Sequence, residues 1–290
     1  MDEPSGVLIV NKPACMTSHD VVNKIRKIYG IKRVGHTGTL DPIATGVLVV
    51  LIGRAAKVAE FVVNDIKKYR ARFQLGITTD TGDITGKIIS TSDNIPPIVN
   101  IKDKFKGAIK QVPPMYSAIK IGGQKLVDLA RQGIEVEREA REIFIHELDI
   151  THVDANVYEL ITTCSKGTYI RTLCEDIGAE LGCGATMVSL VREMNGVFTL
   201  ADSYALEEIE RSKPLIPVEE LFKDLSSVVL SDFYAQLART GNEIYQHKIQ
   251  TAFETKTMVK LYHSGEFFAL AKAEDFEKGS ALKPIKQILI

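Results

Sequence analysis

The chain has 290 residues, 45% of them hydrophobic and 25% charged, and a net charge of -1. This composition is typical of a folded globular protein with a substantial core, and it argues against a disordered chain and against a protein that coats nucleic acid non-specifically. The apolar run from Val47 to Ile52 is far shorter than the roughly 20 residues of a membrane helix. We expect no membrane span and, since no basic segment precedes the first apolar residues, a cytoplasmic protein.

The first part of the chain predicts a strand, a helix and a second strand. Apolar residues indicate the first strand from Gly6 to Asn11, and Thr17 to Asp20 fit a capping box for a helix that ends at Gly30. Val47 to Ile52 is typical of a buried strand. Five bases in and just after the helix indicate either a solvated helix face or a phosphate-binding ridge: Lys24, Arg26, Lys27, Lys32 and Arg33.

The middle of the chain predicts mainly strands. Residues 69–75 alternate between apolar and polar side chains, which indicates a strand with one basic face. The later "GDITGK" resembles half of a P-loop, but its glycines are too close together and Ile88 stands where a Ser or Thr is needed, so we exclude a nucleotide site there. Further on we expect a helix, a segment with charges of both signs and a Gly-Gly turn, two strands and a helix, at residues 100–110, 115–141, 143–153, 157–164 and 168–181.

The last part of the chain changes in character after a proline-containing stretch at residues 211–227. Alternating apolar residues on either side of Ser264 and Gly265 predict a β-hairpin. We therefore predict a small, β-rich C-terminal domain at residues 227–290, after a larger domain at residues 1–226.

The cysteines do not have the spacing of metal ligands. Cys15, Cys164, Cys174 and Cys183 include no C-x-x-C pair, and no His lies near them at zinc-ligand spacing. We interpret them as reduced, mostly buried thiols, and the sequence predicts no metal site.

One loop, "VGHTGTLDPIATGVL" at residues 34–48, has a single carboxylate, Asp41, among glycines and threonines. Pro42 restricts the backbone directly after it. One interpretation is structural, with Asp41 forming an Asx-turn or a helix N-cap. The other is catalytic: the glycines let the backbone pass close to a ligand while Asp41 is held rigidly as a nucleophile. The spacing alone leaves both interpretations open.

Five stretches of the chain share their order and separations with one protein family. They are "NKPACMTSHDVV", "KRVGHTGTLDPIATGVLVV", "KKYRARFQLGITTDTGD", "CSKGTYIRTLCEDIGAELGCGA" and "LVREMNGVF". Over residues 5–225 the chain thereby resembles the bacterial TruB family, the tRNA pseudouridine-55 synthases. The resemblance implies an α+β catalytic domain with a central, mainly antiparallel sheet flanked by helices. It also implies an insertion at residues 116–141 that binds the T-arm of tRNA, and a PUA-like RNA-binding domain at the C-terminus.

The resemblance further implies a reaction. An enzyme of this family flips a T-loop uridine out of the RNA, breaks its N1 to C1′ bond and rejoins the base through C5, with no cofactor or metal. Asp41 matches the essential catalytic carboxylate, and Arg171 matches the arginine that pairs with it. Three routes remain open for Asp41: attack on the ribose C1′, attack on C6 of the base, or removal of a sugar proton.

Four more positions match substrate-binding residues of the family. His36 takes the space of the extruded uridine, Tyr69 stacks on the flipped base, and Tyr169 and Leu190 belong to the base pocket. From the residue pattern alone, His36 is a loop histidine, and Tyr69 and Leu190 are core residues. The chain departs from the family pattern at Cys15, where a glycine is usual, and at Val191, where an arginine is usual.

The expected partner is the T-arm stem-loop of tRNA, bound by a monomer. A non-catalytic tRNA-binding or folding chaperone of the same fold remains an alternative, although a pure binder would not need a paired Asp41 and Arg171. A synthase directed by a guide RNA is a second alternative. Against it, the chain has no long basic extension and has the whole T-arm insertion, so we expect no guide RNA.

Overall fold

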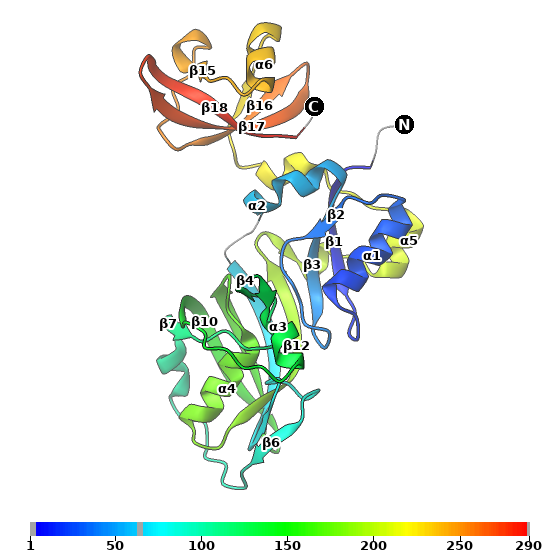
Figure 1. The fold of residues 1–290 in the computed structure, drawn as a ribbon, viewed down its shortest axis with the longest axis vertical. Coiled ribbons are helices and arrows are strands. Elements are labelled where there is room, and N and C mark those ends of the chain that lie inside the picture. The colour runs from blue at the N-terminus through cyan, green and yellow to red at the C-terminus, as the bar shows by residue number, and fades with distance from the viewer. Residues whose placement is uncertain (1–3, 63–65, 289–290) are drawn as a thin grey trace.

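The computed structural model of the protein describes residues 4–62 and 66–288. Within this part of the chain, the largest element is a sheet of nine strands in the order β1-β3-β12-β4-β11-β10-β7, with β2 beside β3 and β13 beside β12 (Figure 1). Its strand pairs are antiparallel except for β12 with β3. The predicted α+β fold with a mainly antiparallel central sheet is confirmed.

The strands and helices of the larger domain have the following bounds. The central sheet contains β1 (Gly6–Lys12), β2 (Val34–His36), β3 (Thr45–Ile52), β4 (Ile66–Leu75), β7 (Gly107–Gln111), β10 (Arg141–Asp154), β11 (Val157–Ser165), β12 (Ala185–Asn195) and β13 (Phe198–Thr199). The helices are α1 (Ser18–Tyr29), α2 (Ala59–Val62), α3 (Leu126–Arg131), α4 (Ile170–Glu180) and α5 (Leu206–Ser212). Among the described residues, no helix is long and apolar enough to cross a membrane.

Strand β3 is apolar at almost every position because both of its faces are buried. Leu48, Val50 and Ile52 belong to one core cluster, which also contains Val21 and Ile25 of α1. The alternate residues of the strand belong to a second cluster on the other face of the sheet: Val47, Val49 and Leu51. The continuous apolar run therefore places β3 between two layers, as the prediction of a buried strand requires.

The ends of α1 agree with their predicted signals. The Thr17 side chain accepts a hydrogen bond from the Asp20 backbone N–H, the Asp20 carboxylate accepts one from the Thr17 backbone N–H, and Gly30 ends the helix with a φ of 67°.

The prediction of a helix at residues 100–110 is wrong. Only Ile101–Phe105 forms a single 3-10 turn, and the next residues form β7, which pairs with β10. A short segment of this length has little helical stability of its own, so sheet pairing decides its conformation.

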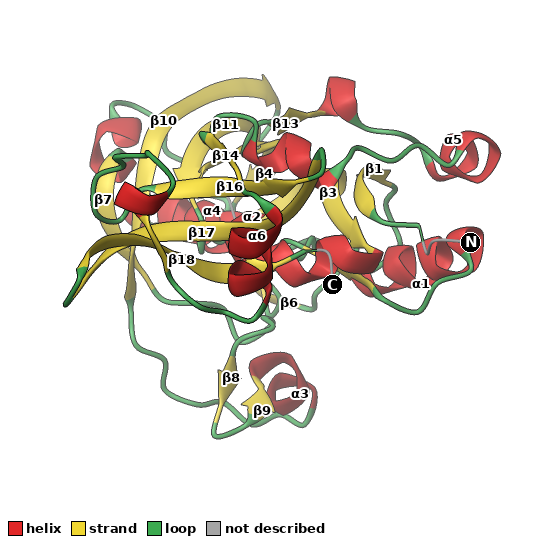
Figure 2. Ribbon diagram, turned by 90° about the horizontal axis from the view of Figure 1, so that it is seen from above, coloured by secondary structure: helices red, strands yellow, loops and turns green. Residues whose placement is uncertain are grey.

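The segment between β7 and β10 includes the predicted T-arm insertion. It consists of a small hairpin, β8 (Lys120–Ile121) and β9 (Gln124–Lys125), followed by α3. The turn between the strands is the predicted Gly122-Gly123 pair, with φ angles of 58° and 85°. Figure 2 shows this hairpin and helix set apart from the sheets at the end of long connections.

The C-terminal region forms a five-stranded sheet in the order β14-β16-β17-β18-β15. Its elements are β14 (Ser227–Val229), α6 (Asp232–Arg239), β15 (Ile244–Tyr245), β16 (Met258–His263), β17 (Glu266–Phe276) and β18 (Gly279–Gln287). The predicted hairpin is β16 with β17, and its turn residues Ser264 and Gly265 both have positive φ. Phe267 and Leu270 of this sheet pack in the second core cluster with Val7 and Ile9 of β1.

Candidate active site

A cavity of about 420 Å³ lies where the β2–β3 loop, β4, β12, the start of α4 and the base of the insertion meet. All six side chains proposed from the sequence line this cavity: His36, Asp41, Tyr69, Tyr169, Arg171 and Leu190. They come from four separate segments of the chain, so the fold, and not proximity in sequence, gathers them.

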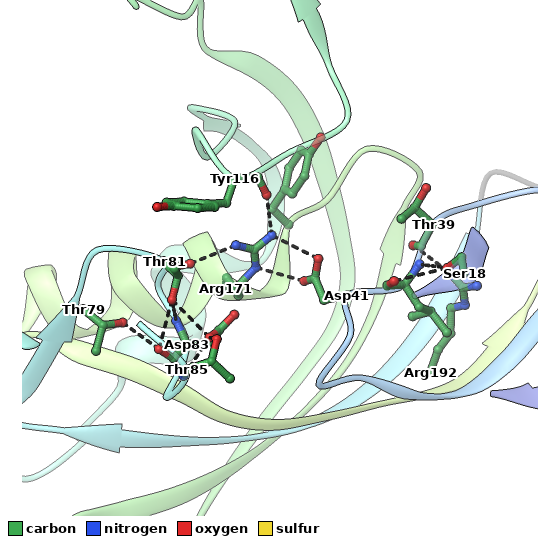
Figure 3. Close-up of polar contacts among 12 residues, drawn as sticks. Ser18, Thr39, Asp41, Thr79, Thr81, Asp83, Thr85, Tyr116, Arg171 and Arg192 are labelled. Carbon is green, nitrogen blue, oxygen red and sulfur yellow. Dashed lines mark hydrogen bonds and ion pairs between the residues drawn. The ribbon is translucent and has the colours of Figure 1, made fainter. Parts of the chain in front are cut away.

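Asp41 and Arg171 form a two-point ion pair at the cavity wall (Figure 3). The Arg171 Nε donates to the Asp41 Oδ2 at 2.9 Å, and its Nη2 donates to the Oδ1 at 3.2 Å. The side chain of Arg171 is 5% exposed, whereas that of Asp41 is 31% exposed. The arginine is thus buried behind the carboxylate, and the carboxylate remains accessible from the cavity.

Two backbone carbonyls complete the surroundings of the Arg171 guanidinium. Its Nη1 donates to the Thr81 oxygen at 2.8 Å, and its Nη2 donates to the Tyr116 oxygen, also at 2.8 Å. Four hydrogen bonds from one planar group leave it little rotational freedom. Because Thr81 follows β5 (Ile77–Thr79) and Tyr116 begins the insertion, Arg171 connects two further segments to the loop that carries the carboxylate.

The loop that carries Thr81 is organised by Asp83. The Asp83 Oδ1 accepts from the Thr81 hydroxyl at 3.1 Å and from the Thr85 backbone N–H at 2.9 Å, and the Thr79 hydroxyl donates to the Asp83 carbonyl at 2.8 Å. Figure 3 shows this network beside Arg171. The "GDITGK" stretch is therefore a tight loop that fixes the direction of the Thr81 carbonyl.

The loop before Asp41 is fixed by residues from α1 and β12. The Ser18 hydroxyl accepts from the Leu40 N–H at 2.9 Å. The Arg192 side chain, in a residue 1% exposed, donates from Nε to the Val47 carbonyl at 2.7 Å and from Nη2 to the Gly38 carbonyl at 3.1 Å. Arg192, which remains beside the departure at Val191, is thus a buried support of the loop.

Lys12 and Cys15 support the other side of the same loop. The Lys12 Nζ donates to the carbonyls of Pro13 and Met16 at 2.7 and 2.6 Å, and burial lowers the pKa of Lys12 to about 8, opposed by the nearby Asp41. Cys15 has a φ of 63°, and its N–H donates to the Pro42 carbonyl at 2.9 Å. Cys15 therefore has a left-handed backbone conformation, which a cysteine adopts less readily than the glycine that is usual in the family pattern.

Burial keeps the aromatic groups of the cavity neutral. The His36 Nδ1 accepts from the Gly38 N–H at 3.3 Å, and burial together with the charge of Arg192 lowers the pKa of His36. Burial also raises the pKa values of the Tyr69 and Tyr169 phenols. The wall around Asp41 thus offers rings, an apolar Leu190 side chain and phenolic hydroxyls, in a form suited to a planar, uncharged ligand.

Sequence reasoning identified the side chains that line the cavity but missed those that position them. Lys12 and Arg192 donate to backbone carbonyls, and the Asp83 carboxylate accepts from the Thr81 hydroxyl and the Thr85 N–H of its own loop. Within the described ranges, no group of three or more His, Cys, Asp or Glu residues is placed to hold a metal ion.

Comparison with family models places the chain beside known RNA-modifying enzymes. The model for the TruB family pseudouridylate synthase N-terminal domain matches residues 26–170, and that for the tRNA pseudouridylate synthase B C-terminal domain matches residues 171–230. The chain is 42% identical to the tRNA pseudouridine synthase B of Clostridium tetani over 275 residues, which covers 92% of this chain and 95% of the relative. It is also 42% identical to that of Bacillus licheniformis, over 82% of each chain.

Solved structures show the same fold at lower sequence similarity. A chain in a structure of an H/ACA RNP bound to a substrate RNA containing 2'-deoxyuridine has a TM-score of 0.72 and 23% identity, covering 98% of this chain and 85% of that one. A chain in a Cbf5-Nop10-Gar1 complex has a TM-score of 0.70 and 24% identity, with the same coverage. These likenesses extend along nearly the whole chain.

Proposed function

Because the chain belongs to the TruB family of pseudouridylate synthases, we propose that it isomerises the uridine at position 55 in the T-loop of tRNA to pseudouridine. Its full-length relatives are named tRNA pseudouridine synthase B, which supports tRNA as the substrate. The observation that carries the proposal is Asp41, accessible from the cavity and paired at two points with the buried Arg171.

The reaction needs an ionised carboxylate in a cavity that retains a detached base. The N1 to C1′ bond breaks, the uracil turns, and a C5 to C1′ bond forms; the proton on C5 leaves and N1 gains one, so the product is an isomer. Asp41 supplies the carboxylate, and the two hydrogen bonds from the adjacent Arg171 guanidinium fix its direction. Tyr69 and Leu190 form the surfaces against which the flipped base lies.

The insertion is proposed to hold the T-arm, and the C-terminal sheet at residues 227–290 is proposed as a further RNA-binding domain. The Tyr116 carbonyl, at the start of the insertion, accepts a hydrogen bond from Arg171. The insertion is therefore in direct contact with one member of the ion pair. His36 is proposed to take the place that the flipped uridine leaves.

The test is an assay of the purified protein with an unmodified tRNA transcript after EDTA treatment, with no other RNA or protein added. We expect pseudouridine at position 55, mapped by chemical labelling and primer extension. Binding without conversion would support the chaperone alternative, and conversion only after addition of a guide RNA would support the guided one. Conversion at other positions alone would contradict the T-loop assignment.

A further inference from the structure

A buried glutamine holds the residue before α4 at both sides of its peptide backbone. Gln111, the last residue of β7, is 2% exposed. Its Oε1 accepts from the Tyr169 N–H at 2.7 Å, and its Nε2 donates to the Tyr169 carbonyl at 3.1 Å. The side-chain amide thus pairs with the backbone as a neighbouring strand would, across 58 residues of sequence.

Tyr169 is the N-cap residue of α4 and makes no capping hydrogen bond with its own side chain. Its carbonyl already accepts the first helical bond, from the Leu173 N–H at 3.0 Å. An N-cap residue determines the direction in which the first turn of a helix starts. Gln111 restrains the N-cap residue through that residue's own N–H and carbonyl, whereas a capping Ser, Thr or Asp side chain would accept from an N–H of the first turn.

The first turn of α4 carries two side chains of the cavity, Tyr169 and Arg171. Gln111 pairs through its backbone with Arg141 of β10, in the sheet that also presents Tyr69. The chain then continues from Gln111 to Tyr116, whose carbonyl accepts from Arg171. One short segment therefore connects the sheet, the start of the insertion and the start of α4.

From this arrangement we propose that Gln111 is a positioning residue for catalysis, which sets the place of Tyr169 and Arg171, and through Arg171 the direction of Asp41. The inference rests on the proposed function. We expect Gln111 to affect the chemical step and not the binding of tRNA, because it is not among the residues that line the cavity. Misplacement of a reacting group by about 1 Å can reduce a rate by about 100-fold.

The chain offers a matched control in Gln246, a glutamine 4% exposed in the C-terminal region. Its Nε2 donates to the Phe253 carbonyl at 2.9 Å, and its Oε1 accepts from the Phe253 N–H at 2.6 Å. It makes the same paired contact with a backbone residue as Gln111, but far from α4 in the chain. Loss of this amide removes the same pair of backbone hydrogen bonds, together with contacts to the Ser280 and Thr251 hydroxyls, without touching the start of α4.

The experiment compares Gln111→Ala, Gln111→Glu and Gln246→Ala in the full-length protein. Gln111→Ala should reduce the single-turnover rate on unmodified tRNA by about 10- to 100-fold and change the Kd for tRNA less than threefold. Gln111→Glu keeps the acceptor for the Tyr169 N–H but places a buried carboxylate oxygen against the Tyr169 carbonyl in place of the donor, so its rate should also fall below that of wild type. Gln246→Ala, measured at saturating tRNA so that any change in RNA binding by the C-terminal region does not enter, should keep the wild-type rate while its Tm falls at least as much as that of Gln111→Ala.

Hydrogen exchange gives a readout that does not depend on activity. Peptides covering residues 168–174 should exchange faster in Gln111→Ala, but not in Gln246→Ala. Equal rates for wild type and a folded Gln111→Ala, or equal rate losses in the two alanine variants, would overturn the proposal. If Gln111→Ala does not fold, a wild-type rate in Gln111→Glu would overturn it. A wild-type protein that forms no pseudouridine would instead refute the proposed function, whereas unchanged exchange at residues 168–174 would refute the positioning role alone.

Discussion

Two arginine networks, one on the solvent face of β4 and one at the start of α4 beside the cavity, look alike in distance and differ in setting. On the solvent face, Arg70 donates to Glu193 and Glu159, each at 2.7 Å, with its side chain 41% exposed. On the cavity side, Arg171 donates to Asp41 at 2.9 and 3.2 Å, with its side chain 5% exposed. Tyr69, next to Arg70 in the strand, points to the buried face, as alternation along a strand requires.

The two networks differ in the burial of the arginine and in the backbone carbonyls that Arg171 contacts in addition to its carboxylate. Water and salt screen Arg70, and exposed pairs of this kind contribute about 0 to 1 kcal/mol. Arg171 is closed in by the Thr81 and Tyr116 carbonyls, so its position is fixed by four contacts and its charge is poorly screened. The comparison shows that the geometry of an ion pair does not identify a site. The site is identified by a buried arginine that presents an accessible carboxylate.

The largest expected effect is that of Asp41→Asn, which keeps the size of the side chain but removes its charge. Pseudouridine formation should fall below detection, while affinity for tRNA stays within about tenfold, or about 1.4 kcal/mol. Single-turnover assays and equilibrium binding measure the two quantities. Appreciable turnover by this variant, with deamidation excluded by mass spectrometry, would rule out Asp41 as the catalytic carboxylate.

The paired substitutions Arg171→Lys and Arg70→Lys test the comparison itself. Lysine keeps the charge but cannot reach two carboxylate oxygens and two carbonyls in one plane. Arg171→Lys should lower the single-turnover rate by about 10- to 100-fold, whereas Arg70→Lys should leave it within about twofold, because its network is exposed. Similar losses in both variants, with unchanged Tm, would mean that burial does not separate the two networks.

Tyr69 gives a smaller graded effect on the buried face. Tyr69→Phe keeps the ring, whereas Tyr69→Leu loses base stacking of about 1 to 3 kcal/mol. We expect the single-turnover rate to decrease in the order Tyr, Phe, Leu. If the rates instead follow the Tm values of the variants, Tyr69 supports the core and does not contact the base.

A pH-dependent effect on stability is expected at Glu175, one turn after Arg171 in α4. Burial raises the pKa of Glu175 from 4.5 to about 7. Between these values the folded protein keeps a proton that the unfolded chain has lost, so the contribution of Glu175 to stability decreases as pH rises from 4.5 to 7. Glu175→Gln should therefore be stabilised relative to wild type across this range, as measured by urea unfolding at several pH values. Parallel stability curves for the two proteins would contradict the shift.

The sequence predicted those parts of the fold that depend on local signals. The capping residues Thr17 and Asp20 indicated the start of α1, and Gly30 indicated its end. The helix prediction for residues 100–110 was wrong because their conformation depends on pairing with β10, which lies some thirty residues further along the chain. No local pattern encodes the register of that pairing.

The candidate site divides in the same way. The resemblance supplied Asp41 and Arg171 as a pair, and the structure places them in contact. It did not supply Gln111, Thr81 or Tyr116, because their contributions are hydrogen bonds to or from the backbone. Almost any residue type can offer a carbonyl, so the sequence does not mark such contacts.

The second core cluster has a consequence for how the protein folds. Phe267, Leu270 and Ile288 of the C-terminal region belong to the same core cluster as Val7 and Val49, on the face of β1 and β3 that α1 leaves open. A chain cut near residue 226 would remove these three side chains from the shared cluster, and burial of each such side chain contributes about 1.5 to 3 kcal/mol. Because the two sheets share this cluster, heating should melt both of them together in one cooperative transition.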